Sequence, residues 1–262
     1  MGKITDALRK AAEERMARLE KLDSKSEVRY QFIAQKTVDS KIDPRIVTFY
    51  EPSCPIAEQF RILRTNLLAL NAQRPLHIIT ITSSINGEGK TITSINLAIS
   101  MAQDLNKKQI LLIDADLRRS KVNKYLGFEQ EAGLSELITG RINTEDAFVS
   151  IGINNLTILS AGKPPQNPAE LLGSVKFKNL LNVLKEKYDY IILDSPPVIP
   201  VTDAGLIGAQ SDGVIMVIQA GRTQRGVVSH AQGLLKQAQA KLLGYILTNI
   251  QYHIPAYIYR YL

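Results

Sequence analysis

The chain of 262 residues is 45% hydrophobic and 22% charged, a composition typical of a globular protein with enough chain for a sizeable core. Its formal net charge of +7 comes without a block of Lys and Arg or interleaved aromatic and basic residues, so we expect no nucleic-acid partner. Cys54 is the only cysteine, which excludes an internal disulfide or a thiolate metal cluster and favours a reducing cytoplasm.

The first 52 residues predict a helix followed by a linker. Residues 1 to about 30 place apolar side chains on one helical face, among them Ile4, Leu8 and Leu19. This amphipathic helix either packs on its own domain or docks to a partner. Residues 31–52 show no clear period and contain two prolines, which indicates a linker. No apolar run approaches the length of a membrane span, so any membrane role would require a partner.

Strands and helices alternate from residue 53 to residue 250. Short apolar runs predict buried strands at 76–82, 109–116, 155–162, 188–197, 213–221 and 242–250. Helices are expected at 57–70, 89–103, 175–187 and 226–240. The pattern predicts an α/β fold, a mostly parallel sheet with helices on both faces, in which ligands bind at the carboxyl ends of the strands.

A phosphate-binding loop is predicted at residues 83–91, SSINGEGKT. It has Ser84 where the usual loop has its first glycine, but the preceding strand and following helix are those of a P-loop NTPase. Glycines let backbone N–H groups surround phosphate, Lys90 bridges the β and γ phosphates, and the Thr91 hydroxyl ligates Mg²⁺. The predicted cofactors are therefore ATP and Mg²⁺, with nucleotide contacts from Ser84, Asn86, Gly87, Glu88, Gly89, Lys90, Thr91 and Ile92.

Three aspartates at predicted strand ends complete this site. Asp114 and Asp116 follow one strand and Asp194 follows another. Asp194 is the expected Mg²⁺-binding carboxylate, acting mostly through water, and Asp114 orients the ion. Asp114 is also the best candidate to accept a proton from an attacking hydroxyl. Asp116 supports the same site, and Lys90 neutralises charge on the transferred group.

The end of the chain suggests what accepts the phosphoryl group. Four of the ten tyrosines lie within the last eleven residues, far above an even spread: Tyr252, Tyr257, Tyr259 and Tyr261. They are either acceptor hydroxyls on a tail or part of an aromatic edge strand packed on the domain. Asn249, just before them, either contacts the nucleotide base or forms a turn at the strand end.

At this point the chain resembles the bacterial tyrosine kinases that regulate capsule and exopolysaccharide synthesis, in their free-standing cytoplasmic form. The resemblance covers about residues 53–262 and includes a Tyr cluster at the end of the chain. It rests on five segments taken together: SCPIAEQFRILRTNL (53–67), SSINGEGKT, LLIDADLRR (111–119), YIILDSPPV (190–198) and GKPPQNPAELLGS (162–174). It implies an ATP-dependent tyrosine autokinase in which Lys90, Thr91 and the three aspartates take the roles given above.

The resemblance also implies an assembly. Glu58, Arg61 and Arg64 form a Glu-x-x-Arg-x-x-Arg motif that in the family contacts the next subunit of a ring. The resemblance therefore implies a homo-oligomer that phosphorylates its tails in trans. It further implies a membrane-embedded polysaccharide co-polymerase as activator, an opposing tyrosine phosphatase, and a place at the inner face of the membrane through that partner. Read from the residues alone, the motif could equally be a solvated helix face with a local ion pair.

Two other functions share these motifs. A dimeric ATPase of the chromosome-partition and septum-placement type has the same sheet, loop and Asp motifs, but it usually carries a second Lys where this chain has Ile85. A scaffold that senses nucleotide and controls assembly is the other alternative. Arg118 and Arg119 follow Asp116, and one of them either reaches phosphate or the neighbouring subunit, or both lie on a solvated turn.

Overall fold

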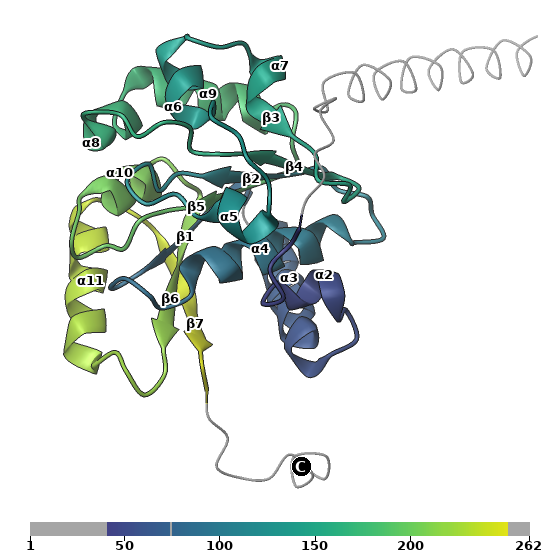
Figure 1. The fold of residues 1–262 in the computed structure, drawn as a ribbon. Helices are drawn as coiled ribbons and strands as arrows, with labels where there is room; N and C mark the ends of the chain where they lie inside the picture. The colour runs from purple at the N-terminus through teal and green to yellow at the C-terminus, as the bar shows by residue number, and fades with distance from the viewer. Residues whose placement is uncertain (1–40, 74, 251–262) are drawn as a thin grey trace, which may run out of the picture.

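A computed structural model describes residues 41–73 and 75–250 of the chain (Figure 1). The predicted N-terminal helix and the Tyr-rich tail lie outside the described residues.

The described residues form a seven-stranded sheet in the order β3-β4-β2-β5-β1-β6-β7. All neighbouring strands are parallel except β3 and β4, which pair antiparallel at one edge. The mostly parallel sheet predicted from the sequence is thus confirmed. The strands are β1 (Ile78–Ser83), β2 (Ile110–Asp114), β3 (Phe148–Val149), β4 (Leu156–Leu159), β5 (Tyr190–Asp194), β6 (Gly213–Gln219) and β7 (Leu242–Thr248).

Helices cover both faces of the sheet, as predicted (Figure 1). One face carries α2 (Val47–Tyr50), α3 (Pro55–Gln73), α4 (Lys90–Ala102) and α5 (Val122–Leu126). The other carries α6 (Leu134–Thr139), α7 (Thr144–Ala147), α8 (Pro168–Leu172), α9 (Val175–Lys185), α10 (Asp203–Ala209) and α11 (Arg225–Gln237).

The central strands are apolar on both sides because helices bury both sides. In β1, Ile79 and Ile81 join the cluster beneath α3 and α4, whereas Ile78 joins the cluster beneath α9. Every residue of β1, β2 and β5 is buried. Alternate residues therefore stabilise opposite layers, which explains why β2 and β5 show continuous apolar runs before their final Asp.

Residues 41–52 differ from the predicted linker, because they pack on the domain. Ile42 and Ile46 are buried in the same cluster as α4. The backbone N–H and the hydroxyl of Thr48 both donate to Asn96 of α4, at 3.0 Å each. The one-turn helix α2 is too short to produce a recognisable period, and the same is true of the two-residue strand β3.

Candidate active site

The loop between β1 and α4 has the backbone that a phosphate cradle requires. Gly87 and Gly89 have φ angles of +85° and +94°, in the left-handed region that favours glycine. Ser84 is fully buried and does not have a positive φ, so its position needs a small side chain but no glycine. Its hydroxyl donates to the Sδ atom of Met216. The missing first glycine of the motif is therefore no obstacle to the loop conformation.

The side chains of Glu88 and Arg222 hold the loop in place by hydrogen bonds to its backbone. The buried carboxylate of Glu88 accepts hydrogen bonds from the Ile85 and Gln219 backbone N–H groups and from the Thr223 hydroxyl. Glu88 thus directs its side chain to the end of β6, so only its backbone is available to a nucleotide. The Arg222 guanidinium donates to the Asn86 and Gly87 carbonyl oxygens, at 3.2 and 3.3 Å.

Two hydroxyl groups in the first turns of α4 donate hydrogen bonds to the carboxylate of Asp194. The Thr91 hydroxyl donates to its Oδ2 at 2.7 Å, and the Ser94 hydroxyl donates to its Oδ1 at 3.0 Å. Lys90 Nζ donates to Asp116 Oδ2 at 2.9 Å and lies 3.9 Å from Asp194 Oδ2. The structure therefore brings Lys90, Thr91, Asp116 and Asp194 together, as the motifs predicted.

Asp114 lies opposite Asp194, because the two residues are paired in the register of β2 and β5. Its Oδ2 accepts from the Ser120 hydroxyl and from the N–H groups of Lys121 and Val122, each at 2.9–3.0 Å. Among the described residues, its Oδ1 accepts only from the Asp116 N–H, at 3.1 Å, and so keeps acceptor capacity. Asp114 thus fixes the turn that follows β2 with one carboxylate oxygen, and its other oxygen can still accept a proton.

The electrostatics of the cluster favour a cation. Burial and then the charge of Asp194 raise the pKa of Asp114 to about 7. Burial also raises the pKa of Asp194, against the opposing effect of Lys90. Burial by itself would lower the pKa of Lys90, but Asp194 and Asp116 together raise it. Two buried carboxylates that repel one another are the environment into which a divalent cation fits.

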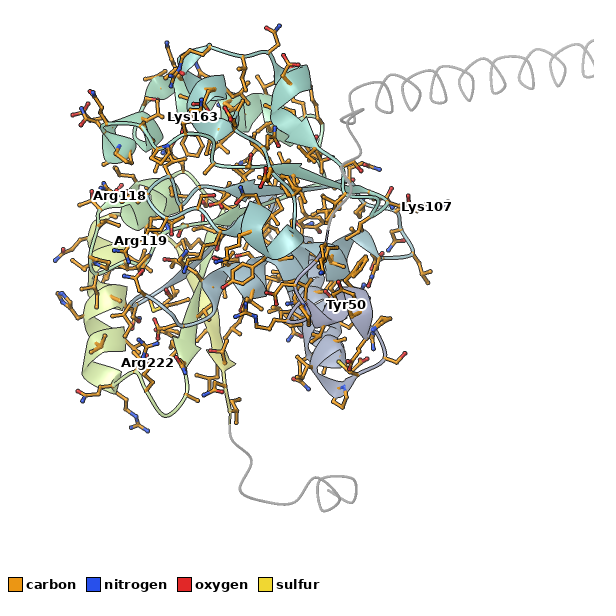
Figure 2. The ribbon with its side chains drawn as sticks, viewed as in Figure 1. Tyr50, Lys107, Arg118, Arg119, Lys163 and Arg222 are labelled. Atoms are coloured by element: carbon orange, nitrogen blue, oxygen red, sulfur yellow. The ribbon has the colours of Figure 1, made fainter. Side chains whose placement is uncertain are left out.

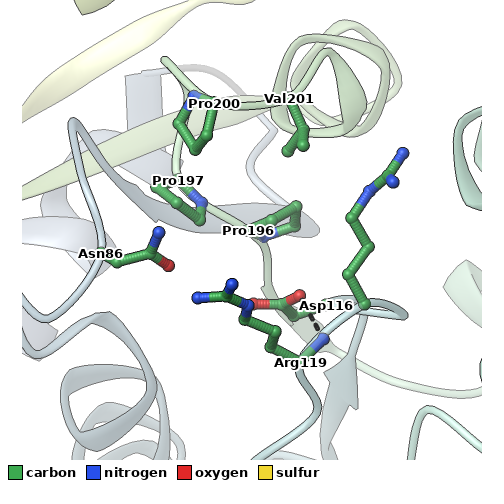
Figure 3. A pocket seen from close by; sticks show the side chains of 8 residues that line it. Asn86, Asp116, Arg119, Pro196, Pro197, Pro200 and Val201 are labelled. Carbon is green, nitrogen blue, oxygen red and sulfur yellow. Dashed lines mark hydrogen bonds between the residues drawn. The ribbon is translucent and has the colours of Figure 1, made fainter.

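The two arginines that follow Asp116 have different surroundings (Figure 2). Arg118 makes a bidentate ion pair with the buried Asp203 at the start of α10, with N–O distances of 2.8 and 3.0 Å. The guanidinium of Arg119 has no hydrogen bond or ion pair with any residue that the structure describes. Arg119 instead lines a cavity beside the phosphate loop (Figure 3).

The remaining predicted site residues lie in three places. Ile92 faces the core, and Asn249 follows β7 with a φ of +54°. On α3, Arg61 pairs with Glu58 at 2.6 Å, which is the local ion pair considered above. Arg64 reaches inward, where it donates to the Ser100 carbonyl oxygen at 2.6 Å and lies 3.6 Å from Asp104. The four tail tyrosines lie outside the described residues.

Sequence reasoning missed Ser94, Arg222 and Asp203. Ser94 lies one helical turn after Lys90 and could have been suspected from its spacing along α4, because residues four apart share a helix face. Arg222 and Asp203 gave no such signal, because their partners are 135 and 85 residues away in the chain.

Comparison with known proteins agrees with this geometry. Residues 76–242 match the family described as AAA domain. The chain is 35% identical over 215 residues to the tyrosine-protein kinase YwqD of Bacillus subtilis, covering 82% of this chain and 90% of that protein. It is 35% identical over 201 residues to the tyrosine-protein kinase CpsD of Streptococcus agalactiae, covering 76% of this chain and 86% of that protein.

Solved structures of both enzyme classes considered above superpose on this chain, the kinase over more of its length. The kinase domain of the Escherichia coli tyrosine kinase ETK superposes with a TM-score of 0.73 at 28% identity, covering 80% of this chain and 83% of that chain. The cell division ATPase MinD of Pyrococcus furiosus gives a TM-score of 0.55 at 25% identity, covering 65% of this chain and 71% of that chain. Within the described residues, no helix is both long and apolar enough to span a membrane.

Proposed function

Because the chain belongs to the family of bacterial tyrosine-protein kinases, we propose that it transfers the γ-phosphoryl group of ATP to tyrosines of its own C-terminal tail. The observation that carries the proposal is the meeting of Lys90, Thr91 and Asp194 at the mouth of the phosphate loop. The acceptors are Tyr252, Tyr257, Tyr259 and Tyr261.

The phosphate loop binds the nucleotide through its backbone. N–H groups of residues 86–91 and the N-terminus of α4 bind the phosphate oxygens, and Lys90 moves from Asp116 to the β and γ phosphates. Asn249 contacts the base at the carboxyl end of β7. Glu88 and Arg222 keep the loop in its binding conformation, through the hydrogen bonds described above.

The carboxylate cluster suits Mg²⁺, because Asp114 and Asp194 are buried on neighbouring strands and the charge of Asp194 raises the pKa of Asp114. The Thr91 hydroxyl and Asp194 would hold the ion, directly or through water, and Asp114 would orient it. When bound, Mg²⁺ neutralises negative charge on the β and γ phosphates.

The transfer itself requires few protein groups. The tyrosine oxygen forms a bond to the γ phosphorus, and the bond from that phosphorus to the β,γ-bridging oxygen breaks, with its electron pair leaving on ADP. The phenolic proton passes to Asp114, whose Oδ1 keeps acceptor capacity. Lys90 neutralises charge on the moving phosphoryl group, and Asp116 positions Lys90 before nucleotide arrives.

We infer that tails are phosphorylated between subunits of a ring. Glu58 and Arg61 present exposed charge on α3, and their side chains are 54% and 35% exposed. Ile56 and Ile62 add exposed apolar surface on the same helix. Arg64 supports this surface indirectly, because its bond to Ser100 fixes α3 on α4.

The cellular setting follows from the family resemblance. The kinase regulates the synthesis and export of exopolysaccharide or capsule from the inner face of the membrane. A membrane-embedded co-polymerase activates it there, and a tyrosine phosphatase opposes it.

Labelled ATP tests the activity. The chain is incubated with γ-labelled ATP and Mg²⁺, with and without the activator's cytoplasmic segment, and the label is mapped. We expect label in the tail, and none in Lys90→Met or in a variant with the four tail tyrosines changed to Phe. Phosphate release without labelled protein would instead support an ATPase. Assembly that depends on nucleotide, without either product, would support a scaffold.

Mixing tests transfer between subunits. The Lys90→Met chain keeps its acceptors and lacks activity, whereas the four-Phe chain keeps activity and lacks acceptors. Label in the Lys90→Met tail after mixing requires transfer in trans, and an unlabelled mixture would exclude it. Arg61→Ala should lower the mass in solution, with Arg45→Ala, another exposed arginine in a local ion pair, as its control.

A further inference from the structure

A cavity of about 150 Å³ opens beside the phosphate loop (Figure 3). Three segments line it: Asn86 of the loop, the turn after β2 with Asp116, Arg118 and Arg119, and the segment after β5 with Pro196, Pro197, Pro200 and Val201. Asp116 also holds Lys90 at 2.9 Å, so the cavity adjoins the group expected at the γ phosphate. The cavity therefore lies next to the phosphate loop, where an acceptor must approach.

One wall of the cavity is apolar and rigid. Pro196 and Pro197 are buried, and the segment is tied to the start of the phosphate loop. The Thr82 hydroxyl donates to the Pro196 carbonyl oxygen at 2.8 Å, and the Val198 N–H donates to the Ser83 carbonyl oxygen at 2.8 Å. Proline rings on a backbone fixed in this way keep their shape without further loss of entropy when a ligand binds.

The opposite wall carries the guanidinium of Arg119, which has no ion-pair partner within residues 41–73 and 75–250. Arg118 is committed to Asp203, and that ion pair anchors the turn. The Arg119 backbone N–H donates to Asp116 Oδ1 at 3.0 Å, which fixes the point from which its side chain extends. Figure 3 shows the Arg119 side chain extending from this turn in the direction of Asn86.

We propose that this cavity receives the ring of the acceptor tyrosine, and that Arg119 contacts the phosphoryl oxygens as the group passes to that ring. The inference rests on the proposed kinase function and names the acceptor subsite of the same active site. Arg119 itself forms and breaks no covalent bond. The only bonds that change are those of the phosphoryl transfer described above.

The two walls match the two ends of a tyrosine. Its ring is apolar and flat, and it can pack on the prolines, whereas its oxygen is polar and needs a charged neighbour during transfer. A guanidinium offers several donors in a plane and suits phosphoryl oxygens better than an ammonium does. Because Arg119 pairs with no residue in the described part of the chain, it can bind the phosphoryl group without first breaking an ion pair there.

The four-Phe chain as enzyme and the Lys90→Met chain as acceptor give an assay in which both partners are full-length. In the enzyme chain, Arg119→Gln should lower the rate of transfer about 100-fold, the usual effect of removing one preorganised donor to developing charge. Arg119→Lys should restore part of the rate. Val201→Trp, which fills the cavity, should raise the KM for the acceptor chain at least about tenfold. Affinity for a fluorescent ADP should change in none of the three.

Lys107→Gln is the matched control, because Lys107 is also exposed and lies on the opposite side of the molecule (Figure 2). Thermal melting confirms that each variant is folded. If the wild-type chain labels none of its own tail tyrosines, the proposed function fails and the subsite fails with it. If it labels them but the four-Phe chain labels no acceptor chain, transfer in trans is excluded, and the Arg119 and Val201 variants are compared by the rate at which they label their own tails. If the four-Phe chain is active and Arg119→Gln and Val201→Trp match it, the subsite alone is wrong. An equal loss of rate and ADP affinity in Arg119→Gln would also overturn the subsite.

Discussion

Glu88→Gln should destabilise the chain although it changes only one atom of the side chain. Three donors converge on the Glu88 carboxylate, which is 1% exposed: the Ile85 and Gln219 N–H groups and the Thr223 hydroxyl. A glutamine amide offers one acceptor oxygen and an NH₂ group. Whichever way the amide turns, its NH₂ faces a half-buried backbone N–H that has lost its acceptor. The Thr223 hydroxyl can rotate to accept, but a backbone N–H cannot.

One unsatisfied buried N–H costs about 1–3 kcal/mol, and exchanging charged for neutral hydrogen bonds adds about 1 kcal/mol. The free energy of unfolding from urea denaturation should therefore fall by about 2–4 kcal/mol. Glu129→Gln, at an exposed glutamate, should change it by less than about 0.5 kcal/mol. A Glu88→Gln chain as stable as the Glu129→Gln chain would refute this view of the loop.

Two further changes test the cluster and the loop. The pKa of Asp114 is raised from 3.8 to about 7, so between these values the folded chain keeps a proton that the unfolded chain has lost. Without nucleotide, the free energy of unfolding should fall by up to about 1.4 kcal/mol per pH unit as pH rises across that window, and Asp114→Asn should remove this slope in urea titrations. Gly87→Ala should cost about 1–2 kcal/mol and weaken ADP binding, because its φ is positive and a Cβ would lie 2.9 Å from Arg222 Nη1. Gly233→Ala, with open space around it inside α11, should be neutral or stabilising by up to about 1 kcal/mol.

The sheet was predictable because its central strands combine two simple signals. Each is a short apolar run, and each ends in a polar residue at the carboxyl edge, as β2 ends at Asp114 and β5 at Asp194. The order of strands was not predictable from these signals. The edge strand β3 and the helix α2 were missed because two to four residues are too few to show a period.

The candidate site was predictable where it depends on local sequence. The loop glycines, Lys90 and Thr91 follow from spacing along one strand–helix unit, and the structure places them as expected. Arg222 joins the site only because β6 lies beside β1, and that neighbourhood is a property of the folded sheet. Likewise, Arg118 and Arg119 are equivalent in sequence, and only the position of Asp203 at the start of α10 distinguishes them.

The fold by itself does not separate a kinase from a partition-type ATPase, because both classes share the sheet and the phosphate loop. The MinD structure superposes on this chain with a TM-score of 0.55, so the residues of the site must distinguish the two chemistries. Ile85 is one of them. Its N–H is bound to Glu88, and it stands where the partition type usually carries a Lys that reaches a second subunit. Lys90 supplies one cation to the transferred phosphoryl group, and Arg119, whose guanidinium pairs with no described residue, lines the adjoining cavity and can supply a second from within the same subunit.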